Sequence, residues 1–268
     1  MPFSITFPSS TLQSCETDND RVLRSRLGKA YVVTQADLID GSLWKQCFSH
    51  LCFDHRHFHT VEKTIRQDFD YRYLILEDAE AGIRAIQPVF LIQQDITAGL
   101  PRAFHALMKT IRRVFPNFLK LKTLMVGATV GEGHLGAASD PDRAWLGEAL
   151  HEVVGDYAHE CKASMIVLKD FHSSYRNHLA PFSNNGYSRV PSMPGVKLDL
   201  DFASFDEYMT RRLSKATRKS LRRKFKKAAA GAPIEMEVLC NVGHLIDEIY
   251  PLYDAVFERA EFRFEKLT

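Results

Sequence analysis

Apolar residues along the first two hundred positions fall into short runs of two kinds. Runs rich in β-branched and aromatic residues predict strands, and runs with apolar residues three or four positions apart predict helices. The predicted strands are 29–34, 71–76, 83–96, 121–130 and 163–171, with one or two more in 187–202. The predicted helices are 37–51, 54–67, 103–116 and 142–162, with a short helix or loop at 173–186.

The strongest local signals are a hairpin and a capped helix. Tyr71–Leu76 and Ile83–Ile96 flank an acidic turn that contains Gly82, which is typical of an antiparallel hairpin. We expect this hairpin at the centre of a mixed sheet, with 163–171 as another central strand. Ser139 or Asp140 can cap the long helix, whose first turn contains Pro141.

The pattern begins again near Asp201. Helices are predicted for 205–213, for the basic stretch that follows it and for 245–260, and a strand is predicted for 232–240. We therefore expect a first domain over residues 1–200 and the beginning of a second over 201–268.

The basic stretch concentrates the positive charge of the chain. Ten of the seventeen residues between Arg211 and Lys227 are Lys or Arg, whereas the whole chain has 35 basic and 33 acidic residues. A general nucleic-acid binder spreads its positive charge over a face, so this charge indicates a local site. Nucleic-acid binding is not expected, except to tRNA.

Helical spacing gives the basic stretch two faces. Ser214 is a candidate N-cap, and Arg218 lies at the border of an apolar stripe, where its planar guanidinium suits a phosphate. An ordinary solvated helix face is the alternative. The side chains expected to be buried are Thr217, Leu221, Phe225 and Ala228. Those expected to be exposed are Lys219, Arg223 and Lys226.

A second candidate site is the glycine loop "GEGHLG", residues 131–136, which follows a predicted strand. Gly131, Gly133 and Gly136 match G-x-G-x-x-G, so a dinucleotide site is one interpretation. Glu132 and His134 could act as general base and acid, or could be two exposed loop residues.

Cysteine and histidine positions bear on metals and on the cellular compartment. The five cysteines form no C-x-x-C pair, which indicates reduced thiols. His55 and His59 would share a helix face, but spacing fixes no third ligand, so no metal is expected. The N-terminus has no secretory signal pattern and no apolar run is long enough to span a bilayer, so a cytoplasmic protein without a membrane span is expected.

The segment "FDEYMTRRLSKATRKSLRRKFKKA" resembles FemAB-like and related GNAT-type acyltransferases, in which a Ser-x-x-Thr-Arg element opens a basic helix. The resemblance continues through residues 234–268 and extends more loosely over the first half. It implies an α/β (α+β) fold: a GNAT-like mixed central sheet with flanking helices, followed by the start of a second GNAT-like unit. The expected strands and loop of that unit do not follow, so the sequence resembles a C-terminally truncated member.

The resemblance also implies a function, which is N-acyl transfer from a thioester or ester donor to an amine. Acyl-CoA or aminoacyl-tRNA is the expected donor, and a small-molecule or muropeptide-like phosphorylated compound is the expected substrate. Arg218 matches an arginine that holds a diphosphate in peptidoglycan-modifying members, and Lys215 and Arg222 are its neighbours on the helix.

In GNAT folds the pyrophosphate loop lies between the fourth strand and the third helix, where "GEGHLG" would fall. Thr129 and Val130 stand where the usual loop has a polar side chain, so a loop without a ligand is also possible. The alternative function is a non-catalytic GNAT-like module that binds an anionic ligand or partner through helix 214–230.

Overall fold

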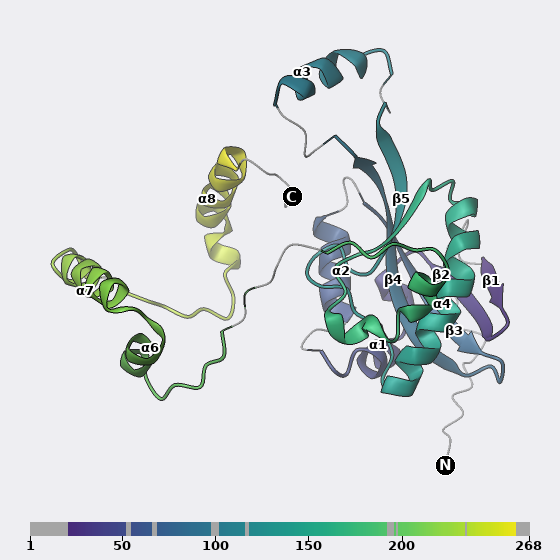
Figure 1. Cartoon of the computed structure of the whole chain (residues 1–268), viewed down its shortest axis with the longest axis horizontal. Coiled ribbons are helices and arrows are strands. Elements are labelled where there is room, and N and C mark those ends of the chain that lie inside the picture. The colour runs from purple at the N-terminus through teal and green to yellow at the C-terminus, as the bar shows by residue number, and fades with distance from the viewer. Residues whose placement is uncertain are drawn as a thin grey trace. The chain divides into compact units, whose positions relative to one another are not determined.

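The computed structural model describes residues 21–51, 55–65, 69–97, 102–115, 118–191, 196, 198–233 and 235–260 (Figure 1). They divide into unit 1, which extends to Pro191, and unit 2, which runs from Ser192 to Phe264. The sequence placed this division near Asp201. No helix among the described residues has both the length and the apolar character needed to cross a bilayer.

Unit 1 is built on one mixed sheet with the strand order β1-β2-β3-β4-β5-β6. The strands are β1 (Val22–Ser25), β2 (Gly28–Val33), β3 (Phe69–Asp78), β4 (Ile83–Asp95), β5 (Lys120–Val126) and β6 (Met165–Leu168). Neighbouring strands are antiparallel from β1 to β5, and β6 is parallel to β5. The predicted mixed α/β architecture is therefore confirmed.

The predicted hairpin is formed by β3 and β4 and occupies the middle of the sheet. Asp78 closes its turn, because the Asp78 N–H donates to the Gly82 carbonyl over 2.9 Å and the Asp78 carboxylate accepts from the Gly82 N–H over 2.8 Å.

The prediction that 163–171 forms a central strand is wrong. β6 contains only four residues, pairs with β5 alone and is half-buried, so it lies at the edge of the sheet. Its apolar run predicts burial but not strand order. Strand order depends on which strand β6 pairs with, and that strand is distant in sequence.

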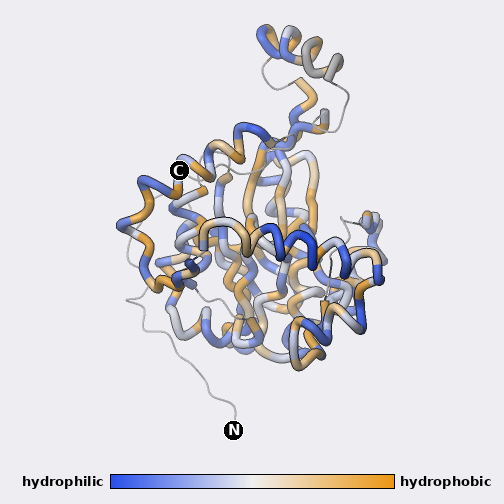
Figure 2. The backbone as a smooth tube through the Cα atoms, turned by 90° about the vertical axis from the view of Figure 1, so that its left-hand side faces the viewer, coloured by the Kyte–Doolittle hydropathy of each residue, from blue (hydrophilic) through white to orange (hydrophobic). Residues whose placement is uncertain are grey.

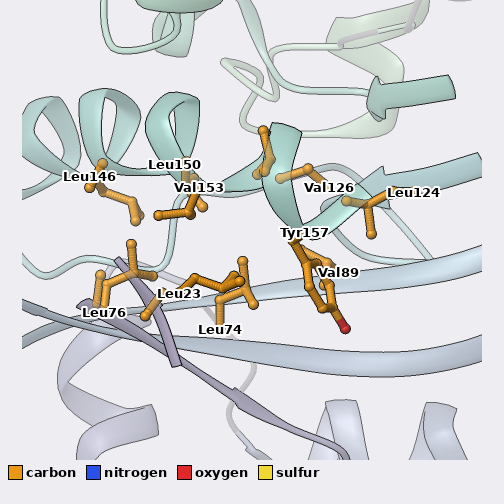
Figure 3. Close-up of a cluster of buried hydrophobic side chains, with 14 of the residues drawn as sticks. Leu23, Leu74, Leu76, Val89, Leu124, Val126, Leu146, Leu150, Val153 and Tyr157 are labelled. Carbon is orange, nitrogen blue, oxygen red and sulfur yellow. The ribbon is translucent and has the colours of Figure 1, made fainter. Parts of the chain in front are cut away.

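Helices cover both faces of the sheet. On one face α4 (Asp140–Glu160) packs against alternate strand residues such as Leu74 and Leu76 (Figure 3). On the other face α1 (Gly41–Cys47) and α2 (His55–Thr64) pack around Trp44, which is 0% exposed and stacks on Phe58 with ring centroids 4.7 Å apart. The period-two alternation of the strands supplies both cores.

Capping residues set several helix ends. Ser139 caps α4 by accepting from the Asp142 N–H, as predicted. The predicted helix 37–51 is split, because Asp40 accepts from the Ser42 N–H and starts α1 only at Gly41, after a short 3-10 helix η1 (Ala36–Leu38). The predicted helices 54–67 and 103–116 are observed as α2 and as α3 (Arg102–Ile111), while Asp54 and Pro116 lie outside the described residues.

The segment after β6 contains two short helices, η2 (Ser173–Arg176) and α5 (Ala180–Asn184). The described residues of 187–202 contain no strand, so the strands expected there are not observed. This segment includes Pro191, and proline cannot donate to a strand ladder.

Unit 2 contains α6 (Phe205–Arg212), α7 (Lys215–Ala229), η3 (Gly243–Leu245) and α8 (Ile246–Arg259), which confirms the predicted helices. The predicted strand at 232–240 is wrong for the described part of that range. Its apolar residues Met236 and Val238 are exposed, since no neighbouring strand is present among the described residues of the unit to pair with it.

Candidate functional site

The segment that connects β5 to α4 contains the glycine loop and is held at three points, two on β4 and one on the residues after β6. The Gly127 N–H donates to the Pro88 carbonyl over 2.9 Å, and the Gly133 N–H donates to the Asp170 carbonyl over 3.1 Å. The Gly136 carbonyl accepts from the Ile86 N–H over 2.9 Å. Residues 128–132 therefore form an anchored tip that extends from the end of β5.

Two of the three predicted cofactor-binding glycines pack tightly. A Cβ atom at Gly133 would lie 2.3 Å from the Lys169 carbonyl oxygen, and one at Gly136 would lie 1.9 Å from that of Ile86. Gly131 is different, because it is exposed, has φ of +83° and has open space where a side chain would be. The tip around Gly131 is thus the part of the loop that is open to a ligand.

His134, a predicted catalytic residue, lies in a hydrogen-bonded cluster that the loop shares with two other segments. The Tyr175 hydroxyl from η2 lies 3.3 Å from Nδ1 of His134 and 3.3 Å from Nε2 of His50, which follows α1. Tyr175 is only 7% exposed, His134 is half-buried and His50 is exposed. The three side chains connect the interior of the loop to solvent.

The electrostatics of this cluster favour neutral imidazoles. Burial is the largest effect on the pKa of His134 and lowers it. The charge of Glu132 raises this pKa, and the charge of His172 lowers it. Burial of part of its ring lowers the pKa of His50, and the charges of Arg143 and His134 add to the effect. Burial likewise raises the pKa of the Tyr175 phenol, which keeps its proton.

Glu132, the other predicted catalytic residue, lies on the exposed tip of the loop. Its carboxylate is close enough to influence both His134 and Tyr175 electrostatically. The structure therefore brings the two predicted catalytic residues into one neighbourhood, with His134 in the hydrogen-bonded cluster and Glu132 facing solvent.

A small pocket opens where the loop leaves β5. It lies between α2 and the sheet and is bordered by Gly127, Ala128 and Thr129. Its other walls come from α2, β3 and β4, namely His57, Phe58, Val61, Tyr71, Tyr73, Pro88, Val89 and Phe90. The cavity volume, taken as the space that the centre of a water-sized sphere can reach, is about 10 Å³. This volume holds about one water-sized group. Thr129 Oγ1, 3.3 Å from the Tyr71 hydroxyl, supplies a polar wall.

The predicted substrate-binding residues lie on α7 in unit 2. Lys215 and Arg222 are exposed. Arg218 is half-buried, and its Nη1 donates to the carbonyls of Leu213 over 2.7 Å and of Thr210 over 3.2 Å, at the C-terminal end of α6. The guanidinium is pinned, as predicted, but it is pinned by the end of a neighbouring helix.

The predicted burial of the α7 stripe is wrong. Thr217, Phe225 and Ala228 are exposed and Leu221 is half-buried. Among the described residues of unit 2 only Met209 is buried, so the unit has no core to cover this stripe. The predicted exposure of the cationic face is confirmed, since Lys219, Arg223 and Lys226 are all exposed.

The sequence did not identify His50 or Tyr175 as site residues. Both lie outside the glycine loop, and only the tertiary structure brings them to His134. One available signal was the cluster of polar residues after β6, where His172 accepts from the Ser174 N–H and starts η2.

Possible metal ligands do not converge among the described residues, where no group of three or more His, Cys, Asp or Glu side chains could hold a metal ion. His59 instead pairs with Asp37, at 3.1 Å. No family model, curated protein or solved structure matches the chain.

Proposed function

We propose that this protein is an N-acyltransferase that uses the glycine loop and the His134 cluster of unit 1. The observation that carries the proposal is the position of the loop, directly after a central antiparallel hairpin and its neighbour β5, and before the long helix α4. Hydrogen-bonding and titratable side chains converge there from three separate segments.

The order of elements supports the GNAT-like part of the proposal. In that fold the donor pyrophosphate loop lies between the fourth strand and the third helix. Counted from β2, β5 is the fourth strand, and α4 is the third helix when α3, inserted between β4 and β5, is left out. The exposed tip around Gly131 would receive the donor, with backbone N–H groups facing the negative charge.

In the reaction, the acceptor amine attacks the carbonyl carbon of the donor ester or thioester. A C–N bond forms, the C–S or C–O bond breaks, and the leaving group departs as thiolate or alkoxide, which takes up a proton. His134 accepts the proton that the attacking amine loses, and it does so as a neutral imidazole.

The cluster provides a route for that proton. The Leu135 N–H donates to one lone pair of the Tyr175 oxygen. The second lone pair can accept from one imidazole, while the hydroxyl proton is donated to the other imidazole. When Nε2 of His134 gains a proton, Nδ1 can pass one to Tyr175, and Tyr175 can pass one to His50. The exposed His50 then releases a proton to water.

The pocket beside Thr129 is proposed to receive the acyl group. Its mostly apolar walls and its room for about one water-sized group suit the methyl end of an acetyl group and exclude a long chain. This favours a short-chain acyl-CoA as donor, with aminoacyl-tRNA as the less well accommodated alternative.

The test is an acyl-transfer assay on the whole chain. Acetyl-CoA and octanoyl-CoA are each incubated with a panel of primary amines, and the acylated product is measured by mass spectrometry. We expect product from acetyl-CoA, and a loss of roughly 10²-fold or more in His134→Ala, since a general base contributes about 10²–10⁴-fold. His159→Ala, at the exposed end of α4, is the matched control. Equal activity of His134→Ala and the wild type would refute the proposed site.

A second function is favoured by α7 alone. Its exposed cations and pinned Arg218 suit a module that binds an anionic ligand without turnover. This alternative predicts salt-sensitive binding of phosphorylated compounds in the same assay mixtures, with no acylated product.

Tyr175→Phe tests the proton route separately. The ring is retained, so the fold should be kept, while the hydroxyl between the two imidazoles is lost. We expect kcat to fall about tenfold, part of the roughly 10²–10⁴-fold that acid–base groups contribute. In the wild type, kcat/KM should hold through the pH range in which an ordinary histidine titrates and fall only at more acidic pH, because burial lowers the pKa of His134 and the protonated ring cannot accept a proton. A Tyr175→Phe enzyme with unchanged kcat across pH 5–9 would exclude the route.

A further inference from the structure

A protruding segment, here called the arm, connects β4 to β5 over residues 96–119. It leaves the sheet at the paired residues Asp95 and Lys120 and contains α3. Figure 1 shows α3 beyond the start of β5, away from the helices that cover the sheet.

The base of the arm is braced by one arginine. The Arg112 guanidinium binds both carboxylate oxygens of Asp95, at 2.5 and 2.7 Å, and its Nε donates to the Phe118 carbonyl over 3.0 Å. The Asp95 carboxylate also accepts from the N–H and hydroxyl of Thr97. These bonds to Arg112 and Thr97 hold the pKa of Asp95 well below its usual range, so the brace persists at neutral pH.

The described part of the arm exposes large apolar side chains. Six of them are between 38% and 73% exposed, namely Ile96, Phe104, Leu107, Val114, Phe115 and Phe118. At about 100° per residue, Phe104, Leu107, Met108 and Ile111 share one side of α3. Phe104 and Leu107 are exposed on that side, Ile111 is half-buried and Met108 is buried. Figure 2, where α3 is uppermost, shows hydrophobic and hydrophilic positions mixed along this helix.

The charge of the arm has one sign. No Asp or Glu occurs between Ile96 and Gly131, whereas the arm contains Arg102, Lys109, Arg112 and Arg113. Arg112 is engaged in the brace, and the side chains of Lys109 and Arg113 are exposed. Lys109 lies on the opposite side of α3 from Phe104 and Leu107, and Arg113 follows the end of the helix by two residues.

We infer that the arm is a docking element for the surface of an anionic lipid bilayer. An amphipathic helix with Phe and Leu on one face and Lys or Arg on the other lies in the plane of the membrane interface. The exposed Phe104 and Leu107 would enter the boundary between head groups and acyl chains, and Lys109 and Arg113 would bind lipid phosphates.

Two other occupants fit the arm less well. A nucleic acid would use the cations but would leave aliphatic Leu107 and Val114 exposed to water. A second copy of the chain would bring two positively charged arms together with no acidic residue in either, which like-charge repulsion opposes. An anionic bilayer satisfies both the apolar and the cationic parts.

The first experiment is co-sedimentation of the whole chain with phosphatidylcholine vesicles containing 0 or about 30% phosphatidylglycerol. The proposal predicts that Leu107→Ser/Phe115→Ser weakens binding at least about tenfold and that Lys109→Glu/Arg113→Glu removes the preference for phosphatidylglycerol. Lys219→Glu/Arg223→Glu in α7 is the control for exposed charge, and Leu252→Ser in α8 is the control for exposed apolar surface. Binding that the arm variants leave intact and the α7 variant abolishes would overturn the inference.

The second experiment places a reporter on the arm. Phe115→Trp is made in a Trp145→Phe background, which leaves only the buried Trp44 as intrinsic signal. Phosphatidylglycerol vesicles should shift the new emission to shorter wavelength, and circular dichroism checks that the variant is folded. An unchanged spectrum would show that the arm stays in water. A shift without vesicles that grows with protein concentration would show that the arm binds a second copy, and either result overturns the inference.

Discussion

Replacing Gly136 by alanine should lower the free energy of unfolding of unit 1 by about 3 kcal/mol, the upper end of the usual cost of overpacking. The added Cβ would lie 1.9 Å from the Ile86 carbonyl oxygen and 2.5 Å from the Phe48 ring. The first contact is with backbone that belongs to the central hairpin, so side-chain rotation cannot relieve it. Urea unfolding followed by tryptophan fluorescence measures the effect, since both tryptophans, Trp44 and Trp145, lie in unit 1.

Gly155 provides the matched control within the same unit. It lies inside α4, and nothing is within 4 Å of the position that its Cβ would occupy. Gly155→Ala should therefore stabilise unit 1 by about 0.5–1 kcal/mol, because alanine is the better helix former. If Gly136→Ala unfolds at the wild-type urea concentration, the loop does not approach Ile86 as described.

Glu62→Ala should have an effect of similar size for a different reason. The Glu62 side chain is 4% exposed, and its Oε2 accepts from the Ala36 N–H over 2.9 Å and from the Tyr73 hydroxyl over 3.1 Å. Burial, and then the Glu62 charge, raise the pKa of Tyr73, so the phenol remains a donor. Removing the carboxylate leaves two buried donors unsatisfied, which should cost about 3 kcal/mol.

Two further substitutions separate hydrogen bonding from charge at Glu62 and provide an exposed control. Glu62→Gln keeps an acceptor oxygen and should cost about 1 kcal/mol, the usual difference between charged and neutral hydrogen bonds. Glu148→Ala, on the exposed side of α4, should change stability by no more than about 0.5 kcal/mol. Equal losses for Glu62→Ala and Glu62→Gln would mean that the charge, and not the two donors, decides stability here.

The sequence predicted the parts of this fold that depend on local interactions. The Asp78–Gly82 turn, the Ser139 cap of α4 and the Ser214 cap of α7 are all short-range features, and each is observed. Strand order is different, because it depends on which strands meet across long loops. For that reason the edge position of β6 could not be read from its apolar run.

The same distinction applies to the candidate site. Glycine spacing drew attention to His134, but its hydroxyl partner Tyr175 is 41 residues away and His50 lies 125 residues from Tyr175. Periodicity also predicted a buried stripe on α7. Amphipathic spacing shows which residues share a face but cannot show that another element covers that face.

Strand β5 has the arm at its beginning and the glycine loop at its end. Seven residues in extended conformation rise about 3.3 Å each, so the two ends are about 20 Å apart. A surface that holds the arm therefore keeps the loop at least that far away when β5 stands upright on it, and nearer as β5 tilts. An acceptor anchored in the same surface would need a head group long enough to bridge the gap, whereas a freely diffusing acceptor would have no such limit.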